Sequence, residues 1–330
     1  MNTFKIIYRN LKGSKISTIF NFVGLITAFT VFIIIMLYVW TEYSFDTYHQ
    51  DADNIYRLEI KSPGKDKTSV YMAGQTKDVI AEQLSEVVAT TTYMPWGKWG
   101  EFLFEWTRDG QKQQSYEDYA IADKYLTDVF TFDFLRSVSD LPLSEPNSAI
   151  VSDKFALKFW GTTDAITKSF TTNGEKYTVT GVFRTPPKNS LFDAPVIMAF
   201  PTEGWIAESY KTWGIVNFPE FIKVKSGTTA SELQARINGI DILKEKYNFF
   251  DKNNERAEII VRPLSKLRFA KEVAENPLFN TNSQSSVNTL FVVGLFILII
   301  AMLNYINFAT ATLPKRIKNI GVTRILGNSR

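Results

Sequence analysis

A run of uncharged, mostly apolar residues from Ile19 to Trp40 constrains this chain more than any other feature. At about 1.5 Å of rise per residue, a helix of this length measures about 33 Å, enough to cross the hydrocarbon core of a bilayer. Backbone amides inside lipid must pair within their own segment, so the run is a helix. A cleaved signal peptide has a shorter apolar core followed by small residues, whereas this run ends in WTEYSF. We therefore predict a transmembrane helix over residues 19–41.

A second apolar run, over residues 287–313, predicts another transmembrane helix. Pro314 follows it, and because proline lacks a backbone N–H we expect the helix to end there. Small and polar residues within a span usually face other helices. Four residues are predicted to pack in this way: Gly294, Ala301, Asn304 and Asn307. The alternative for the two asparagines is a position at the depth of the lipid headgroups.

Charge is distributed unevenly along the chain. Residues 1–41 carry four Lys or Arg and no acid, and residues 287–330 carry five and no acid. Without these nine, 28 of the 37 basic residues remain against 34 acidic residues, so the middle has a net charge of −6. Basic flanks stay in the cytoplasm and interact with anionic lipid. This predicts two cytoplasmic ends and an external domain over residues 42–286. We expect no nucleic-acid partner, because each basic segment adjoins a span.

The N-terminal segment, residues 1–18, precedes the first span. Phe4, Ile7, Tyr8 and Leu11 recur at helical spacing, with basic residues on the remaining face. This pattern predicts an amphipathic helix on the inner leaflet, and the alternative is a frayed cytoplasmic tail.

The middle of the chain alternates between helical and extended patterns. Helices are predicted over residues 75–88, 152–161 and 229–247. Strands are predicted over residues 55–60, 99–106, 113–121, 194–200, 221–225 and 257–263, and Asn173-Gly174 predicts a further hairpin. Interleaved helices and hairpins favour an α+β fold over a parallel doubly wound sheet. We place a boundary between two lobes near residues 141–147.

Catalytic motifs are scarce in this sequence. The chain has no GxxxxGK[ST], GxSxG or HExxH pattern, and it has no cysteine. The only histidine is His49, with Asp46, Asp51 and Asp53 nearby. Such a set can ligate a metal, but a loop that leaves a bilayer also needs acids as caps and hydrogen-bonding groups. We predict the second role, and a non-enzymatic chain with neither metal nor cofactor.

An aromatic segment spans residues 93–106, YMPWGKWGEFLFEW. Four of its residues are candidates for a surface that binds a partner or a substrate: Trp96, Trp99, Phe102 and Trp106. The alternative is ordinary packing at the edge or in the core of a large β-lobe.

Four parts of the chain resemble the MacB/FtsX-type permeases of ABC transport systems, in particular those of Bacteroidetes. They are YRNLKGSKISTIFNFVGL at the first span, EYSFDTYHQDADNIYRLE after it, LSEPNSAIVSDKFALKFWG with YTVTGVFRTPPKNS in the external domain, and NYINFATATLPKRIKNIGVTRILGNSR at the second span. The chain departs from the family at Ala165 and Thr167, where a proline and a glycine are usual. These permeases have at least four spans, so the resemblance is to an N-terminal portion.

The resemblance implies a non-catalytic permease subunit in the bacterial inner membrane, with a periplasmic central domain and both ends in the cytoplasm. A separate ABC ATPase would move the periplasmic domain through the spans, for export or mechanotransmission. The family's substrates include antibiotics, peptides and lipoproteins, as in the efflux of macrolides or antimicrobial peptides. A second permease copy, membrane lipid and a periplasmic protein are the other implied partners.

Residues 314–330 are similar to the cytoplasmic helix of the family, and we expect a short helix that ends at Gly327. Five residues are predicted to couple it to the ATPase: Ile317, Ile320, Gly321, Arg324 and Leu326. One alternative is an interfacial stub held by anionic lipid. Another, from a different class, is a membrane-anchored sensor that has lost its output module. The proline and the short basic segment, where a sensor has a heptad linker, favour the permease.

Overall fold

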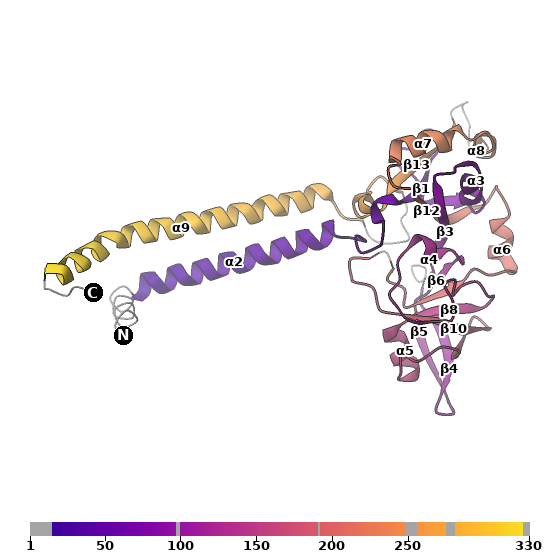
Figure 1. The fold of residues 1–330 in the computed structure, drawn as a ribbon, viewed down its shortest axis with the longest axis horizontal. Helices are drawn as coiled ribbons and strands as arrows, with labels where there is room; N and C mark the ends of the chain where they lie inside the picture. The colour runs from indigo at the N-terminus through magenta and orange to yellow at the C-terminus, as the bar shows by residue number, and fades with distance from the viewer. Residues whose placement is uncertain (1–14, 97–99, 191, 249–255, 275–280, 326–330) are drawn as a thin grey trace. The chain divides into compact units, whose positions relative to one another are not determined.

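The computed structural model describes residues 15–96, 100–190, 192–248, 256–274 and 281–325. They form two compact units (Figure 1): a pair of long helices, and a domain over Ser44–Asn282, called the ectodomain below. The amphipathic pattern from Phe4 to Leu11 lies outside the described residues.

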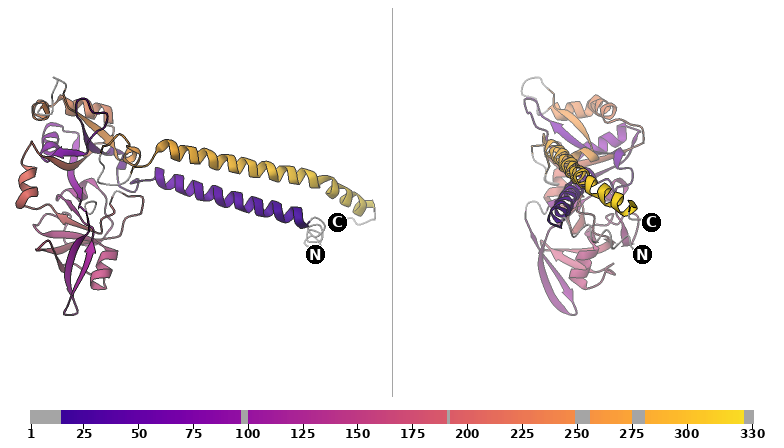
Figure 2. Two further views of the ribbon diagram at one scale, coloured as in Figure 1. Left: turned by 180° about the vertical axis from the view of Figure 1, so that it is seen from behind. Right: turned by 90° about the vertical axis from the view of Figure 1, so that its left-hand side faces the viewer.

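The helix pair consists of α2 (Lys15–Tyr43) and α9 (Gln284–Ile325). The two helices run antiparallel, side by side, in Figures 1 and 2. Each has an apolar stretch long enough to cross a membrane, at Ile19–Tyr43 and at Gln284–Ala311. Most side chains in these stretches are exposed, as expected for helices whose solvent is lipid.

The prediction that Pro314 ends the second helix is wrong, because α9 continues to Ile325. Proline removes one N–H donor and crowds the carbonyl four residues earlier. A proline inside a helix can bend it instead of ending it, and Pro314 lies just past the apolar stretch that ends at Ala311. Figure 1 shows α9 as one ribbon that bends toward its yellow end, as a proline kink produces.

The ectodomain is built on one mixed sheet of 13 strands, ordered β13-β1-β12-β3-β6-β11-β8-β10-β9-β4-β5, with β2 paired to β12 and β7 to β10. All pairs are antiparallel except β8–β10 and β6–β11. The strands are β1 (Ile55–Lys61), β2 (Tyr71–Ala73), β3 (Val87–Pro95), β4 (Phe102–Arg108), β5 (Gln111–Glu117), β6 (Ala120–Ala122), β7 (Phe134–Ser137), β8 (Ser148–Ser152), β9 (Ser169–Thr172), β10 (Glu175–Phe183), β11 (Val196–Ala199), β12 (Val216–Val224) and β13 (Glu258–Pro263).

Short helices cover the sheet and complete its core. They are α3 (Thr76–Gln83), α4 (Leu126–Val129), α5 (Asp153–Trp160), α6 (Gly204–Tyr210), α7 (Ala230–Gly239) and α8 (Asp241–Tyr247), with 3₁₀ turns η1 (Ala52–Asn54) and η4 (Leu264–Phe269). One cluster of buried side chains packs α7 and α8 on β1 and β12, and another packs α5 on β4, β8 and β10. A third lies around α4 and η4. The predicted class, an α+β domain between two apolar helices, is confirmed.

Local sequence signals account for several elements. The turns Asp109-Gly110 and Asn173-Gly174 have positive φ at both residues, which gives the twist that two-residue hairpins require. Helix α5 begins after Ser152, whose hydroxyl accepts a hydrogen bond from the Phe155 N–H at 3.2 Å, and ends at Gly161 with φ of 71°. The hairpin predicted at Asn173-Gly174 and the helix predicted over residues 152–161 are confirmed.

Two predicted helices differ from the structure. The one expected over residues 75–88 ends at Gln83, and Val87 begins β3 instead, because it pairs with Val224 of β12. The one expected over residues 229–247 is interrupted at Ile240, which is extended. The helical period continues across this break because α7 and α8 bury side chains in the same cluster.

The sheet does not part at residues 141–147, where we place the lobe boundary from the sequence. That loop joins β7 to β8, and both strands pair with β10. Leu143 within the loop is buried in the cluster around α4. The chain passes between β13-β1-β12-β3 and the rest of the sheet elsewhere, from β3 to β4 and from β11 to β12.

Candidate functional site: the juxtamembrane clasp

The segment that follows α2 is hydrogen-bonded to the loop between β10 and β11. The Asp46 N–H donates to the Asn189 carbonyl at 2.9 Å. The Asn189 amide donates to the Ser44 carbonyl at 2.8 Å and to its hydroxyl at 3.0 Å. The hydroxyls of Tyr48 and Ser190 lie 2.8 Å apart. Two stretches that carry the family resemblance, 145 residues apart at Ser44 and Asn189, therefore meet.

The same segment also binds the loop between α4 and β7. The Gln50 N–H donates to Thr131 Oγ1 at 2.8 Å, and the Thr131 N–H donates to His49 Nδ1 at 3.1 Å. We name this set the juxtamembrane clasp: Ser44, Asp46, Tyr48, His49, Gln50, Thr131, Asn189 and Ser190. It joins the first residues after a membrane-spanning helix to two loops of the sheet.

Residue type explains how these backbones reach their positions. Asp46 and Asp51 have φ of 56° and 57°, in the left-handed region that aspartate enters more readily than most residues. Pro186 and Pro187 restrict the backbone just before Asn189. The clasp is thus formed by segments with little conformational freedom.

Aromatic rings pack around His49 in the clasp. The His49 side chain is fully buried, and its ring centroid lies 4.1 Å from that of Tyr48, 5.1 Å from Phe130 and 5.5 Å from Phe192. Tyr93 stacks edge-on against Phe192 at 4.7 Å. Burial raises the pKa of both Tyr48 and Tyr93 far above the usual value, so both phenols remain neutral.

A histidine and an aspartate face each other inside the clasp. His49 Nε2 lies 3.7 Å from Asp46 Oδ1, too far for a hydrogen bond, and both side chains are buried. Within the described residues, Nε2 has no hydrogen-bond partner. Asp51 is paired with Lys223 at 3.2 Å. In the part of the chain that the structure describes, no three metal-ligating side chains come together.

The chain leaves the ectodomain beside the same site. The Arg268 guanidinium lies over the Phe45 ring at 5.0 Å, and the Asn282 N–H donates to the Arg268 carbonyl at 2.8 Å. A cavity of about 400 Å³ lies between the segment Phe45–Asn54 and Ser265. The first and last segments of the ectodomain therefore lie side by side, at Phe45 and Arg268.

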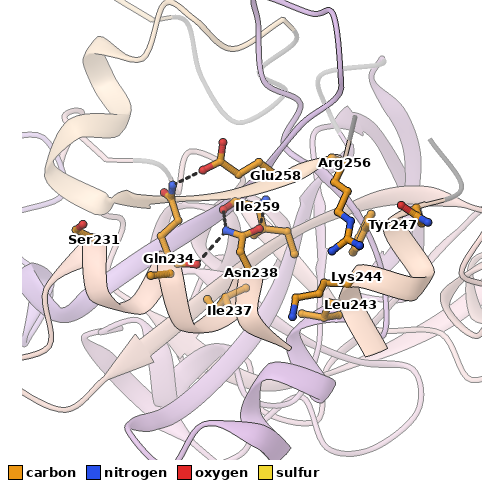
Figure 3. A pocket seen from close by; sticks show the side chains of 13 residues that line it. Ser231, Gln234, Ile237, Asn238, Leu243, Lys244, Tyr247, Arg256, Glu258 and Ile259 are labelled. Atoms are coloured by element: carbon orange, nitrogen blue, oxygen red, sulfur yellow. Dashed lines mark hydrogen bonds between the residues drawn. The ribbon is translucent and has the colours of Figure 1, made fainter. Parts of the chain in front are cut away.

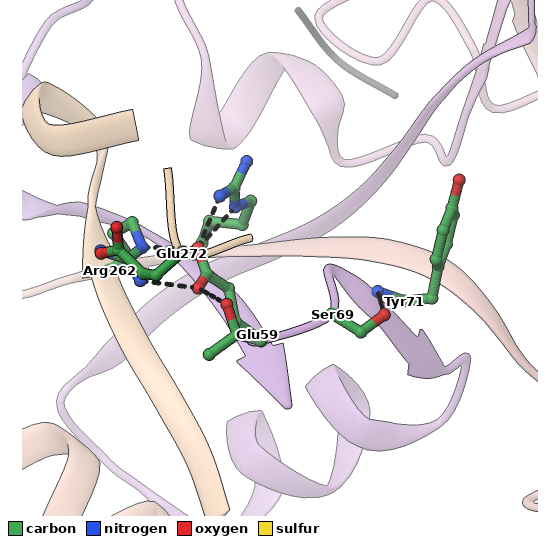
Figure 4. A network of polar contacts seen from close by, with 7 residues as sticks. Glu59, Ser69, Tyr71, Arg262 and Glu272 are labelled. Carbon is green, nitrogen blue, oxygen red and sulfur yellow. Dashed lines mark hydrogen bonds and ion pairs between the residues drawn. The ribbon is translucent and has the colours of Figure 1, made fainter. Parts of the chain in front are cut away.

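A buried charge network holds β1 to β13 (Figure 4). Glu59 accepts hydrogen bonds from Arg57 at 2.5 Å, from Arg262 at 2.6 and 2.9 Å and from Thr68 at 2.7 Å. Arg262 also pairs with Glu272. Burial opposes ionisation, but the hydrogen bonds and charges of the two arginines outweigh it and hold the pKa of Glu59 below its usual value.

A second buried network lies where α3 meets β12. Lys77 Nζ lies 3.1 Å from Asp123 and 3.0 Å from Asp78. The backbone N–H of Lys77 donates to Glu220 Oε2 at 3.0 Å. Tyr210 donates to Asp78 at 2.7 Å. Burial raises the pKa of Glu220 well above its usual value, against the opposing charge of Lys77.

A cavity of about 470 Å³ lies between α7, α8 and β13. Figure 3 shows Gln234 and Asn238 reaching from α7 toward β13. The Asn238 amide exchanges two hydrogen bonds with the backbone of Ile259, at 2.7 and 2.9 Å, and Gln234 accepts from the Val261 N–H at 3.1 Å. These amides pair with the outer edge of the sheet, as a neighbouring strand would.

The aromatic residues singled out from the sequence lie mainly against the core. Trp106 stacks on Phe159 at 3.7 Å and donates to its carbonyl at 2.7 Å. Phe102 packs edge-on against Tyr119 at 4.7 Å, and Trp96 is half-buried at the same cluster. Trp99 lies outside the described residues. These contacts are those of packing, and the role as a binding surface stays a prediction.

Three of the four residues proposed for span packing lie against α2 or are buried. A Cβ on Gly294 would lie 2.9 Å from Met36 and 3.1 Å from Ile35. Asn304 donates to Asn21 at 3.2 Å, and Tyr43 donates to Asn288 at the other end of the pair. Ala301 is buried and Asn307 is exposed.

Four of the five predicted coupling residues continue the helix of the second span. Ile317, Ile320, Gly321 and Arg324 lie in α9, and Leu326 lies outside the described residues. Their role stays a prediction.

The clasp is the part of the site that residue patterns alone miss. Its polar residues carry no spacing that distinguishes them from ordinary loop residues. The signal that could have found them is their position inside two of the stretches that resemble the permease family, SFDTYHQ and PPKNS.

Comparison with known proteins shows the family to which this chain belongs. Residues 18–240 match the family model of the MacB-like periplasmic core domain, so the chain belongs to that family. This is the periplasmic domain of ABC-type transporter permeases, flanked here by two apolar helices. A comparison with curated proteins finds no match.

Three solved structures are similar to this chain, and the first of them shares its fold. A domain of a protein described as a permease from Porphyromonas gingivalis superposes with a TM-score of 0.52 at 18% identity, covering 74% of this chain and 99% of that one. The periplasmic region of MacB from Actinobacillus actinomycetemcomitans gives a TM-score of 0.44 at 8% identity, over 68% of this chain and 95% of that one. The extracellular domain of the ABC-type transporter YknZ from Gram-positive bacteria gives a TM-score of 0.41 at 13% identity, over 63% of this chain and 100% of that one.

Proposed function

We propose that this chain is a permease subunit of an ABC-type export or mechanotransmission system, in which a separate ATPase moves the external domain. Displacement starts at the segment after Pro314, travels along the helix pair and enters the sheet through the clasp. The subunit is non-catalytic and relays motion to the ectodomain.

The continuity of α9 carries this proposal. One helix extends from Gln284, beside the ectodomain in sequence, to Ile325 in the basic segment. A helix without a break passes an axial shift or a rotation along its length, whereas a flexible linker absorbs it. The contacts of Gly294 and of the Asn21–Asn304 pair connect α9 to α2, so both connections to the ectodomain move together.

The same proposal places the protein in the bacterial inner membrane as a dimer, with both ends in the cytoplasm. The acid-free basic ends support this orientation. Single cysteines can be introduced one at a time, since the chain has none. An impermeant maleimide should label Lys112→Cys in intact cells and should leave Lys12→Cys and Lys318→Cys unlabelled. The opposite labelling pattern would contradict the proposed orientation.

Coupling to the ATPase is tested in the full-length protein. We define the docking face of α9 as the side that Ile317, Ile320, Gly321 and Arg324 share. Ile320→Asp and Gly321→Asp place a charge on this face, whereas Asn319→Asp places the same charge on the opposite face of the helix. The two docking-face variants should lose co-purification with the cognate ATPase and permease-dependent ATP hydrolysis, while Asn319→Asp keeps both. If both activities survive the docking-face charges, this segment does not couple the subunits.

A further inference from the structure

The two edge strands of the ectodomain sheet differ in how their outer sides are covered. The outer side of β13 is occupied by α7, because Asn238 bonds to the Ile259 backbone and Gln234 accepts from the Val261 N–H. β5 lies at the opposite end of the sheet and, among the described residues, pairs with β4 alone (Figure 1). An uncovered edge strand is a template for another strand, and natural proteins usually block it.

The turn of the β4–β5 hairpin determines which backbone groups face outward. Both residues of this turn have positive φ, and in a two-residue hairpin the residues that flank the turn, here Arg108 and Gln111, exchange backbone hydrogen bonds. Bonded pairs alternate with unbonded pairs along the hairpin. Lys112, Gln114 and Tyr116 therefore direct their backbone N–H and C=O groups away from β4, in a row with which a further strand can pair.

β5 has few of the features that protect an edge strand. It contains no proline, and its register with β4 continues over all seven residues without a bulge. Lys112 and Gln114 are exposed, and 62% of Tyr116 is exposed. The Ser115 hydroxyl lies 3.5 Å from the Tyr116 carbonyl, at the limit of a hydrogen bond. The charge of Lys112 is the protective feature of this strand, and an added strand must therefore place a compatible group opposite it.

A second copy of β5 supplies that compatible group. When two β5 strands pair antiparallel about a two-fold axis at Gln114, all seven residues of each strand overlap. Lys112 of one strand then lies opposite Tyr116 of the other, where an ammonium group can pack on the exposed ring. Gln111 lies opposite Glu117. Parallel pairing in register would instead place Lys112 beside Lys112, which is unfavourable. The charges of the strand therefore favour the antiparallel arrangement, which is the one that a two-fold axis produces.

We propose that two copies of this chain pair through β5 and form one continuous sheet across both ectodomains. This inference rests on the dimer of the proposed function and names the surface through which the external domains meet. Two strands of seven residues make a small contact compared with the interfaces that hold free proteins together. Anchoring both chains in one membrane raises their effective concentration, so a small contact is sufficient.

Disulfide formation between single cysteines tests the pairing and its register. The full chain, which has no native cysteine, is reconstituted in proteoliposomes and mildly oxidised. Gln114→Cys should form a linked dimer, because the Cα atoms of such a pair lie about 5.5 Å apart, within the range of about 4.4–6.8 Å for disulfides. Lys112→Cys alone should stay monomeric, since its two copies are about 14 Å apart along the strands. A mixture of Lys112→Cys and Tyr116→Cys should link.

Glu105→Cys is the matched control for random collision. Glu105 is exposed and pairs with Gln114 inside the hairpin, so its side chain lies on the same face of the sheet but away from the outer edge. The Gln114→Cys dimer should exceed the Glu105→Cys dimer. Equal yields from the two variants would overturn the proposal.

A proline at the centre of β5 tests whether backbone pairing forms the contact. Gln114→Pro removes an outward N–H that does not donate to β4, so the hairpin keeps its own hydrogen bonds. It should abolish the link between Lys112→Cys and Tyr116→Cys, whereas Gln114→Ala, which keeps the N–H, should preserve it. Persistence of the link in the proline variant would show that the strands do not pair.

The number of chains in the purified assembly separates this proposal from the proposed function. Light scattering in detergent counts the chains without any cysteine. A dimer that gives no Gln114→Cys link would overturn the pairing through β5 and leave the proposed dimer intact. A single chain would overturn both.

Discussion

The interactions that stabilise the ectodomain differ from those that stabilise the helix pair. The ectodomain buries apolar clusters together with whole charge networks, such as Arg57 with Glu59. The helix pair has close approach at Gly294 and a polar contact between Asn21 and Asn304. In water, removal of apolar surface drives packing, whereas in lipid it gives no advantage and shape and polar pairs decide. A substitution should therefore act through charge in the first region and through shape in the second.

The largest effect is expected in the charge network of the ectodomain. Glu59→Ala leaves Arg57 and Arg262 without their shared partner, and loss of one partner of a buried ion pair costs about 3–5 kcal/mol. Urea denaturation of residues 44–282, expressed alone, should show this loss of unfolding free energy. Glu208→Ala is the control, since its pair with Lys211 is exposed, and it should change stability by less than about 0.5 kcal/mol. Similar costs for the two variants would contradict the network's role.

A smaller effect is expected from shape in the helix pair. Gly294→Leu drives a side chain into Met36 and Ile35, and overpacking costs about 1–3 kcal/mol. Disulfide yield between Asn21→Cys and Asn304→Cys, measured in membranes, should fall. Gly24→Leu is the matched control, because a Cβ at Gly24 meets no atom within 4 Å. Equal yields in the two backgrounds would show that close approach at Gly294 does not hold the pair.

The smallest effect sharpens the contrast between the two charge networks of the ectodomain. Burial raises the pKa of Glu220, so its folded state binds the proton more tightly than its unfolded state. The stability that this contributes is complete below the usual glutamate pKa of 4.5 and is lost as pH rises through the folded pKa. Glu220→Gln removes the titration and still accepts from the Lys77 N–H. Relative to the native protein, the variant should be more stable at pH 8 than at pH 5; the reverse trend would contradict the assignment.

Elements with local signals could be predicted from the sequence, and elements set by distant contacts could not. The Asp109-Gly110 turn and the Ser152 cap are local, and the structure has both. Val87 has a helical period with its neighbours, but its partner across the sheet, Val224, decides its state. Arg57 and Glu59 alternate with apolar residues in IYRLEI, which suggests a solvent-facing side, yet both faces of β1 are buried.

The clasp illustrates the same limit for the site. Ser44 and Asn189 are far apart in the chain, and hydrogen bonds between loops have no sequence period. Pro314 shows the reverse error: a strong local signal does not end the helix, because a proline inside a helix can bend it instead of stopping it.

Movement of the ectodomain with the nucleotide state of the ATPase is the central claim, and spin-label distances test it most directly. Labels on Lys112→Cys in the β4–β5 hairpin and on Ser286→Cys at the start of α9 report ectodomain motion relative to the helix. In the complex with its ATPase, the distance distribution should differ between the ATP-bound and ADP-bound states. Insertion of three glycines after Leu313, which breaks the continuity of α9, should abolish the difference. The same distribution in both nucleotide states, with an active ATPase bound, would contradict the account.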